Sequence, residues 1–216
     1  MKVSTRFVAA AAVVATVGTS ASAANLFANG GFETTGTTFP AEGWQAAAAG
    51  YSLSTDARTG NFAAELSSPA FNAAVMLQNS VEDGGLPGIT PGDNPLLSFW
   101  AKGNAGGTGN VLFALRYLDA TGNILADSGL QFFQGDINEN TYTEITYDLG
   151  VVPLGAAAAF IEFSQGIGPI EDPNLPAGTV LIDDLVLDGV PVPEPASLAL
   201  LGLGGVAMLA RRRRQA

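Results

Sequence analysis

The segment LLSFWAK at residues 96–102 decides the fold class of this 216-residue chain. Leu97 and Phe99 alternate with Ser98 and Trp100, so that one side of the segment is apolar and the other is mixed. A period of two residues is typical of a β-strand with one buried face. The segment is therefore predicted to be a strand whose Trp100 side points away from the core.

Similar short segments recur along the chain, separated by Gly, Pro, Asn and Asp, which favour turns. No long stretch keeps the 3.6-residue apolar period of a surface helix. The pattern therefore predicts an all-β domain, a sandwich or barrel of short strands. The predicted strands are residues 25–32, 51–55, 61–66, 74–81, 96–102, 111–118, 124–126, 130–133, 141–148, 157–164 and 180–187.

The N-terminal residues 1–23 have the three parts of a secretory signal peptide. Lys2 and Arg6 form the charged start, residues 7–17 are apolar, and Ala21 and Ala23 form a small-x-small cleavage site. We therefore expect the chain to be exported, with residues 24–189 as its folded domain.

The C-terminal residues 190–216 have a different three-part order. Pro193, Glu194 and Pro195 precede an apolar segment at 196–210, and a basic cluster follows. That cluster consists of Arg211, Arg212, Arg213 and Arg214. The apolar segment is slightly shorter than the roughly 20 residues of a full membrane span, and the arginines would stay on the cytoplasmic side. A transmembrane helix is predicted, either as a simple tail anchor or as a sorting signal.

This C-terminal order closely resembles the PEP-CTERM sorting signal of Gram-negative bacteria. The resemblance implies that an exosortase cleaves the chain near Pro-Glu-Pro. The helix would then hold the protein only transiently in the inner membrane, before its release to the cell surface or the extracellular matrix.

The charge of the exported part excludes one class of partner. Up to and including Pro-Glu-Pro, this part has 3 basic and 20 acidic residues, a net charge near −17. Such a surface repels nucleic acid, whose phosphates need Lys and Arg. The chain also has no His and no Cys, which removes Ser-His-Asp and Cys-His catalysis and nearly all zinc sites.

The body resembles the galactose-binding-like jelly rolls, the fold of many carbohydrate-binding modules. Five segments carry this resemblance in the right order, namely NGGFE at 29–33, GW at 43–44, TGNFAAEL at 59–66, PG at 91–92 before the strand LSFWA, and LIDDLVL at 181–187. The resemblance implies a β-sandwich over nearly all of residues 24–189. Because the shared features are chiefly framework, sugar binding does not follow automatically.

The same resemblance implies a structural Ca²⁺ where the first and last strands meet. Glu33, Asp183 and Asp184 match the positions of its ligands, and Asp56 is expected to add an oxygen. Calcium prefers six to eight oxygen ligands, so carboxylates from both ends of the chain suit it. Alternatively, these acids are only exposed residues at strand ends.

Sugar recognition requires an exposed aromatic ring with polar groups beside it. Trp100 and Lys102 share one strand face, Arg116 is expected on the neighbouring strand, and Tyr142 or Phe133 would contribute. These residues form the predicted glycan site. Alternatively, Trp100 is buried and no such site exists.

Three functions are compatible with these features. The first is a non-catalytic surface or matrix protein, processed by exosortase, that is associated with extracellular polysaccharide and binds glycan. The second is a purely structural or adhesive matrix protein. The least favoured is an extracellular glycoside hydrolase, which would need a cleft with two carboxylates about 5 to 10 Å apart.

Overall fold

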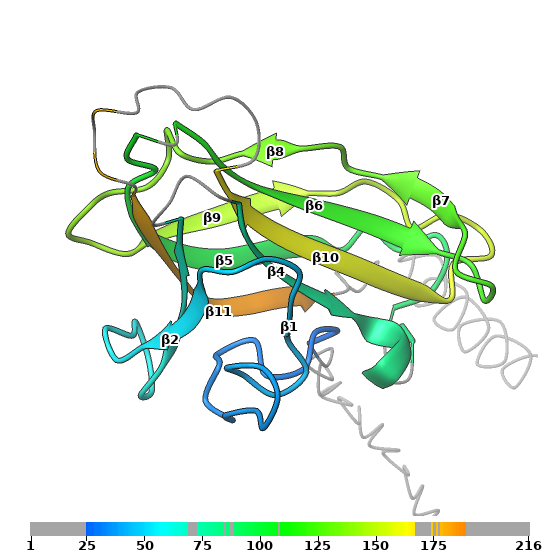
Figure 1. Ribbon diagram of the computed structural model, residues 1–216. Helices are drawn as coiled ribbons and strands as arrows, with labels where there is room; N and C mark the ends of the chain where they lie inside the picture. Colours follow the sequence, from blue (N-terminus) through cyan, green and yellow to red (C-terminus); the bar gives the residue numbers. More distant parts are fainter. Residues whose placement is uncertain are drawn as a thin grey trace, which may run out of the picture.

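The computed structural model describes residues 25–188 apart from 69–72, 84, 87–88, 108, 167–173, 175 and 177. Within these residues, eleven strands form two antiparallel sheets, and Figure 1 shows the two sheets stacked. The prediction of an all-β sandwich is therefore confirmed. Within the described part of the chain, no helix is both long enough and apolar enough to cross a membrane. The signal peptide and the sorting helix predicted above lie outside the described residues.

One sheet, called here the β6 sheet, has the order β1-β4-β10-β6-β7, and β8 also pairs with β6. Its strands are β1 (Gln45–Ala46), β4 (Ala74–Asn79), β6 (Val111–Leu118), β7 (Ile124–Asp127), β8 (Gln131–Phe132) and β10 (Ala158–Gln165). A short 3₁₀ helix, η1 (Ser80–Asp83), follows β4.

The other sheet, called the β5 sheet, has the order β2-β3-β11-β5-β9. Its strands are β2 (Tyr51–Ser54), β3 (Ala63–Ser67), β5 (Leu96–Gly103), β9 (Thr143–Asp148) and β11 (Thr179–Asp188). The last strand, β11, lies in the middle of this sheet. The N-terminal end of the described chain lies beside it, because the N–H of Leu26 donates to the carbonyl of Leu187 at 3.2 Å.

The core lies between the sheets and is rich in aromatic side chains. Phe99 on β5 is fully buried, as the alternation predicted. Its ring makes edge-to-face contacts with Phe113, Phe133 and Phe163, at centroid distances of 5.7, 5.2 and 5.0 Å. Edge-to-face pairs of this kind add stability beyond the area they bury. Trp44 is also in the core, with 1% of its surface exposed.

The predicted strand at residues 25–32 is wrong, because this segment forms turns beside β11. Asn29 and Phe32 have positive φ angles of 50° and 57°, which an extended strand does not allow. Isolated hydrogen bonds join this segment to β11 in place of regular strand pairing. In one of them, the N–H of Leu185 donates to the carbonyl of Gly30 at 2.9 Å. A Cβ at Gly30 would lie 2.1 Å from the Leu185 carbonyl oxygen, so only glycine fits this approach.

Candidate functional site

The outer face of the β5 sheet brings together three of the four predicted glycan-binding residues. Trp100 and Lys102 on β5 lie near Tyr142, and the turn that carries Asp56 and Arg58 is packed against them. The Arg58 guanidinium lies 3.7 Å from the centroid of the Trp100 ring. Lys102 Nζ lies 2.5 Å from Asp56 Oδ2 and 4.8 Å from the centroid of the Tyr142 ring. We call this group the covered face.

The polar groups of the covered face are satisfied by one another. The Tyr142 hydroxyl donates to the backbone carbonyl of Asp56 at 2.5 Å. Burial of this hydroxyl, together with nearby carboxylates, raises the pKa of Tyr142. Trp100 is half-buried, and Arg58 occupies one side of its ring. A sugar that stacked on this side of the ring would have to displace Arg58. The role of Trp100 in glycan binding stays a prediction.

Arg116, the fourth predicted residue, lies elsewhere. The expectation that residues 111–118 neighbour β5 is wrong, because β6 belongs to the opposite sheet. There Arg116 contacts Asp127 at 3.0 Å and Glu162 at 3.5 Å, and its guanidinium lies 5.6 Å from the centroid of the Phe160 ring. Sequence alternation gives the face of a strand but not the sheet to which the strand belongs.

A bulge in β11 aims two adjacent carboxylates at the same turn. The pairing of β11 with β5 shifts register after Asp183, and Asp184 has a positive φ of 48°. Consecutive side chains of a regular strand point to opposite faces, but a bulge can re-aim them. Asp183 Oδ2 accepts the backbone N–H groups of Arg58 and Thr59 at 2.8 and 3.2 Å. Asp184 accepts the Arg58 guanidinium and the Thr59 hydroxyl, both at 2.6 Å.

Glu33 reaches the end of this same turn from the other side. Its carboxylate accepts the backbone N–H groups of Asn61 and Phe62, each at 2.9 Å, and the Asn61 side-chain amide at 2.9 Å. These hydrogen bonds lower the pKa of Glu33. A Cβ at Gly60 would lie 2.3 Å from the Glu33 carboxyl carbon, so a glycine is needed where the turn approaches the carboxylate.

Glu33, Asp183 and Asp184 approach the same turn, but their arrangement does not fit a calcium ion. N–H groups, which cannot bind a cation, already occupy the carboxylates of Glu33 and Asp183. Asp56 is turned toward Lys102. In the described part of the chain, no group of three or more acidic residues is placed to hold a metal. These contacts therefore give no support to the calcium site that the resemblance implies.

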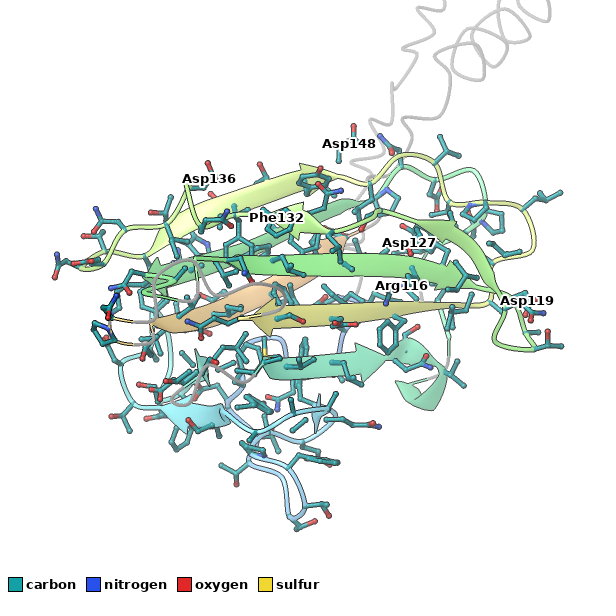
Figure 2. All side chains as sticks on the ribbon, turned by 45° about the horizontal axis from the view of Figure 1, so that its top comes forward. Arg116, Asp119, Asp127, Phe132, Asp136 and Asp148 are labelled. Carbon is teal, nitrogen blue, oxygen red and sulfur yellow. The ribbon has the colours of Figure 1, made fainter. Side chains whose placement is uncertain are left out.

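An open groove lies where the two sheets part, between β8 and β9. Its volume is about 380 Å³, within the usual range of small-molecule sites. The groove is lined by Phe113, Gln131, Phe132, Phe133, Asp136, Thr143, Glu144, Ile145, Thr146 and Tyr147. Figure 2 shows Phe132 and Asp136 toward the β8 and β9 side of the molecule, away from Arg116 on β6.

The groove combines an exposed aromatic ring with hydrogen-bonding groups. Phe132 is 54% exposed, whereas Phe113 and Phe133 are almost fully buried. The Tyr147 hydroxyl donates to Gln131 Oε1, which links the two sheets across the groove, and Gln131 Nε2 donates to the carbonyl of Ser128, so both ends of this amide are engaged within the protein. The Asp136 side chain is exposed and has no hydrogen bond or ion pair among the described residues. Such a surface can stack against the apolar face of a sugar ring and bond its hydroxyls.

Phe132 was not among the residues expected to bind glycan, whereas its neighbour Phe133, which is buried, was. One signal was present, since adjacent side chains of a strand point to opposite faces and two consecutive phenylalanines cannot both enter the core. The pairing of Phe132 with Leu112 and of Gln131 with Phe113 decides which ring is outside. This pairing of β8 with β6 can be known only from the folded structure.

A second hollow, of about 270 Å³, lies in the loop before β1. Its aromatic side chains are Phe39 and Trp44. Trp44 is buried, and its indole N–H donates to the carbonyl of Asn29 at 3.2 Å. This ring is part of the core, so the hollow is the weaker candidate.

Comparison with known families identifies the C-terminal signal. The PEP-CTERM protein-sorting motif matches residues 191–214, which lie outside the described part of the structure. The motif implies an exported protein with a C-terminal sorting signal that is processed by exosortase. No curated protein matches the sequence.

Solved structures with a similar fold are distant in sequence. One is the enzymatically active domain of tailspike protein 4 of bacteriophage CBA120, at 23% identity and a TM-score of 0.56, covering 77% of this chain but only 21% of the tailspike chain. The CBM22-2 xylan-binding domain of Paenibacillus barcinonensis Xyn10C has 16% identity and a TM-score of 0.48, with coverages of 74% and 98%. TmCBM61, in complex with β-1,4-galactotriose, has 15% identity and a TM-score of 0.45, with coverages of 77% and 99%.

Proposed function

We propose that this chain is an exported, non-catalytic protein that binds an extracellular polysaccharide in the groove between β8 and β9. The observation that carries the proposal is the half-exposed ring of Phe132 in a groove that is also lined by the exposed side chain of Asp136. The sorting motif supports an extracellular setting, in which processing by exosortase releases the domain to the cell surface or matrix.

Glycoside hydrolysis is not proposed, because the groove lacks a suitable pair of carboxylates. Asp136 and Glu144 are the two acids that line it. Glu144 lies opposite Trp100 in the pairing of β9 with β5, which puts its side chain on the outer face of the β5 sheet. The two carboxylates therefore do not face each other across the groove.

The experiment is affinity electrophoresis of the full chain, purified in mild detergent, in gels that contain single polysaccharides. We expect at least one polysaccharide to retard the protein, and Phe132→Ala to weaken that binding at least tenfold, which is about 1.4 kcal/mol. Leu154→Ala is the matched control, because Leu154 is also apolar, is 90% exposed and does not line the groove.

Two outcomes would contradict this proposal. If no polysaccharide retards the protein, the structural matrix protein becomes the better description. If Trp100→Ala abolishes binding while Phe132→Ala does not, the binding site lies on the covered face.

A further inference from the structure

The basic residues of the folded domain are few, and each is engaged twice. Residues 24–189 contain three of them, all in the described part. Arg58 is paired with Asp184 and stacked on Trp100. Lys102 is paired with Asp56 and stacked on Tyr142.

Arg116 repeats this arrangement in the other sheet, with Asp127 and Glu162 as partners and the Phe160 ring beside it. Each basic group therefore has both a carboxylate and an aromatic ring. The side chains of Arg58, Lys102 and Arg116 are only 34%, 13% and 23% exposed. Binding of an incoming anion by any of them would compete with these carboxylates, of which Asp184 and Glu162 are only 24% and 22% exposed, and with the aromatic contacts.

The groove has no basic side chain that could bind an anionic group. No Lys or Arg is among its lining residues, and Asp136 adds a negative charge. Recognition of carboxylate, phosphate or sulfate relies on charge-assisted hydrogen bonds from basic side chains. The negative charge of the whole domain also lowers the local concentration of anionic polymers.

We infer that the groove selects an uncharged glycan and rejects polysaccharides that carry carboxylate, phosphate or sulfate groups. This inference rests on the proposed function and adds the class of ligand. Stacking on the Phe132 ring and hydrogen bonds from sugar hydroxyls to the Asp136 carboxylate need no charge on the sugar.

The test compares polysaccharides that share a backbone and differ in charge. The full chain is run by affinity electrophoresis against hydroxyethylcellulose and carboxymethylcellulose, and against dextran and dextran sulfate, with a chelator present to prevent bridging by divalent ions. We expect any retardation to come from the neutral member of a pair, with at least tenfold weaker binding to its anionic partner. Equal or tighter binding of the anionic member would overturn the inference and leave the proposed function intact. Failure of a wider panel of both kinds would remove the proposed function as well.

A pair of variants tests the role of the groove charge. Asp136→Lys should raise the affinity for the anionic polymers severalfold, because it puts a free cation at the groove. Glu42→Lys makes the same change in net charge on an exposed residue that lines the hollow before β1 instead of the groove. A gain in Glu42→Lys alone would place anion binding at that hollow and overturn the inference. Equal gains in both variants would show that net charge alone governs the exclusion, and that the groove does not select its ligand.

Discussion

The covered face and the groove are both built from aromatic rings and polar groups, but they differ in what their rings contact. On the covered face, Trp100 and Tyr142 each hold a basic side chain of the protein. In the groove, the ring of Phe132 is half-exposed and has no such partner among the described residues. The difference teaches that a tryptophan on an outer strand face can be covered by side chains of the protein itself, while a phenylalanine at a sheet edge stays half-exposed.

The largest expected effect is on the stability of the covered face. Asp183 is buried and accepts three backbone N–H groups, those of Arg58, Thr59 and Asp184. Asp183→Ala would leave these partly buried donors without their acceptor, at the lower end of the roughly 1 to 3 kcal/mol that a fully buried group costs. We expect the free energy of unfolding in urea to fall by about 3 kcal/mol or more. Asp136→Ala in the groove should change it by less than about 0.5 kcal/mol. Equal small effects in both variants would contradict the structural role of Asp183.

A smaller effect is expected from the aromatic rings themselves. Trp100→Ala removes the ring beneath Arg58 and should lower the free energy of unfolding by about 2 kcal/mol, less than for a fully buried tryptophan. Phe132→Ala should cost less than about 1 kcal/mol, because its ring is half in solvent. Polysaccharide binding should show the reverse order, with a loss only in Phe132→Ala. If one variant lost both properties, the two regions would not be separable in this way.

The sequence predicted most strands to within two residues because alternation and turn residues are local properties. Residues 96–102 and 111–118 are examples, and they became β5 and β6. The sequence did not predict the partner of each strand, so Arg116 was expected beside Trp100. It also did not show that a backbone turn would meet Asp183 with N–H groups, since the positive φ of Asp184 and the bulge depend on long-range pairing.

The two carboxylates at the turn should respond to pH with opposite signs. Hydrogen bonds from Phe62 and Asn61 lower the pKa of Glu33 from its usual 4.5, so its stabilising contribution is present above that value and is lost as pH falls through the folded pKa. Burial raises the pKa of Asp183 from its usual 3.8, so its contribution from proton binding is lost as pH rises through the folded pKa.

We therefore expect Glu33→Gln to be less stable than the unmodified protein near pH 7, with a gap that closes as pH falls below about 4.5. Urea unfolding between about pH 7 and pH 3 measures this gap. Asp183→Asn is the companion variant, and its gap should not close in this way. A constant gap for Glu33→Gln would mean that its hydrogen bonds do not depend on the charge of the carboxylate.

The smallest expected effect is that of calcium. A ligand present at 100 times its dissociation constant would add about 2.7 kcal/mol to the free energy of unfolding, which is easily detected as a shift in Tm. We expect the Tm of the full chain to be the same with calcium and with a chelator, because N–H groups already satisfy the carboxylates of Glu33 and Asp183. A calcium-dependent shift that disappears in Glu33→Ala would show that the Glu33 carboxylate can bind the ion in place of the N–H groups that it now accepts. In that case, the ion would replace the hydrogen bonds that now join the two ends of the domain.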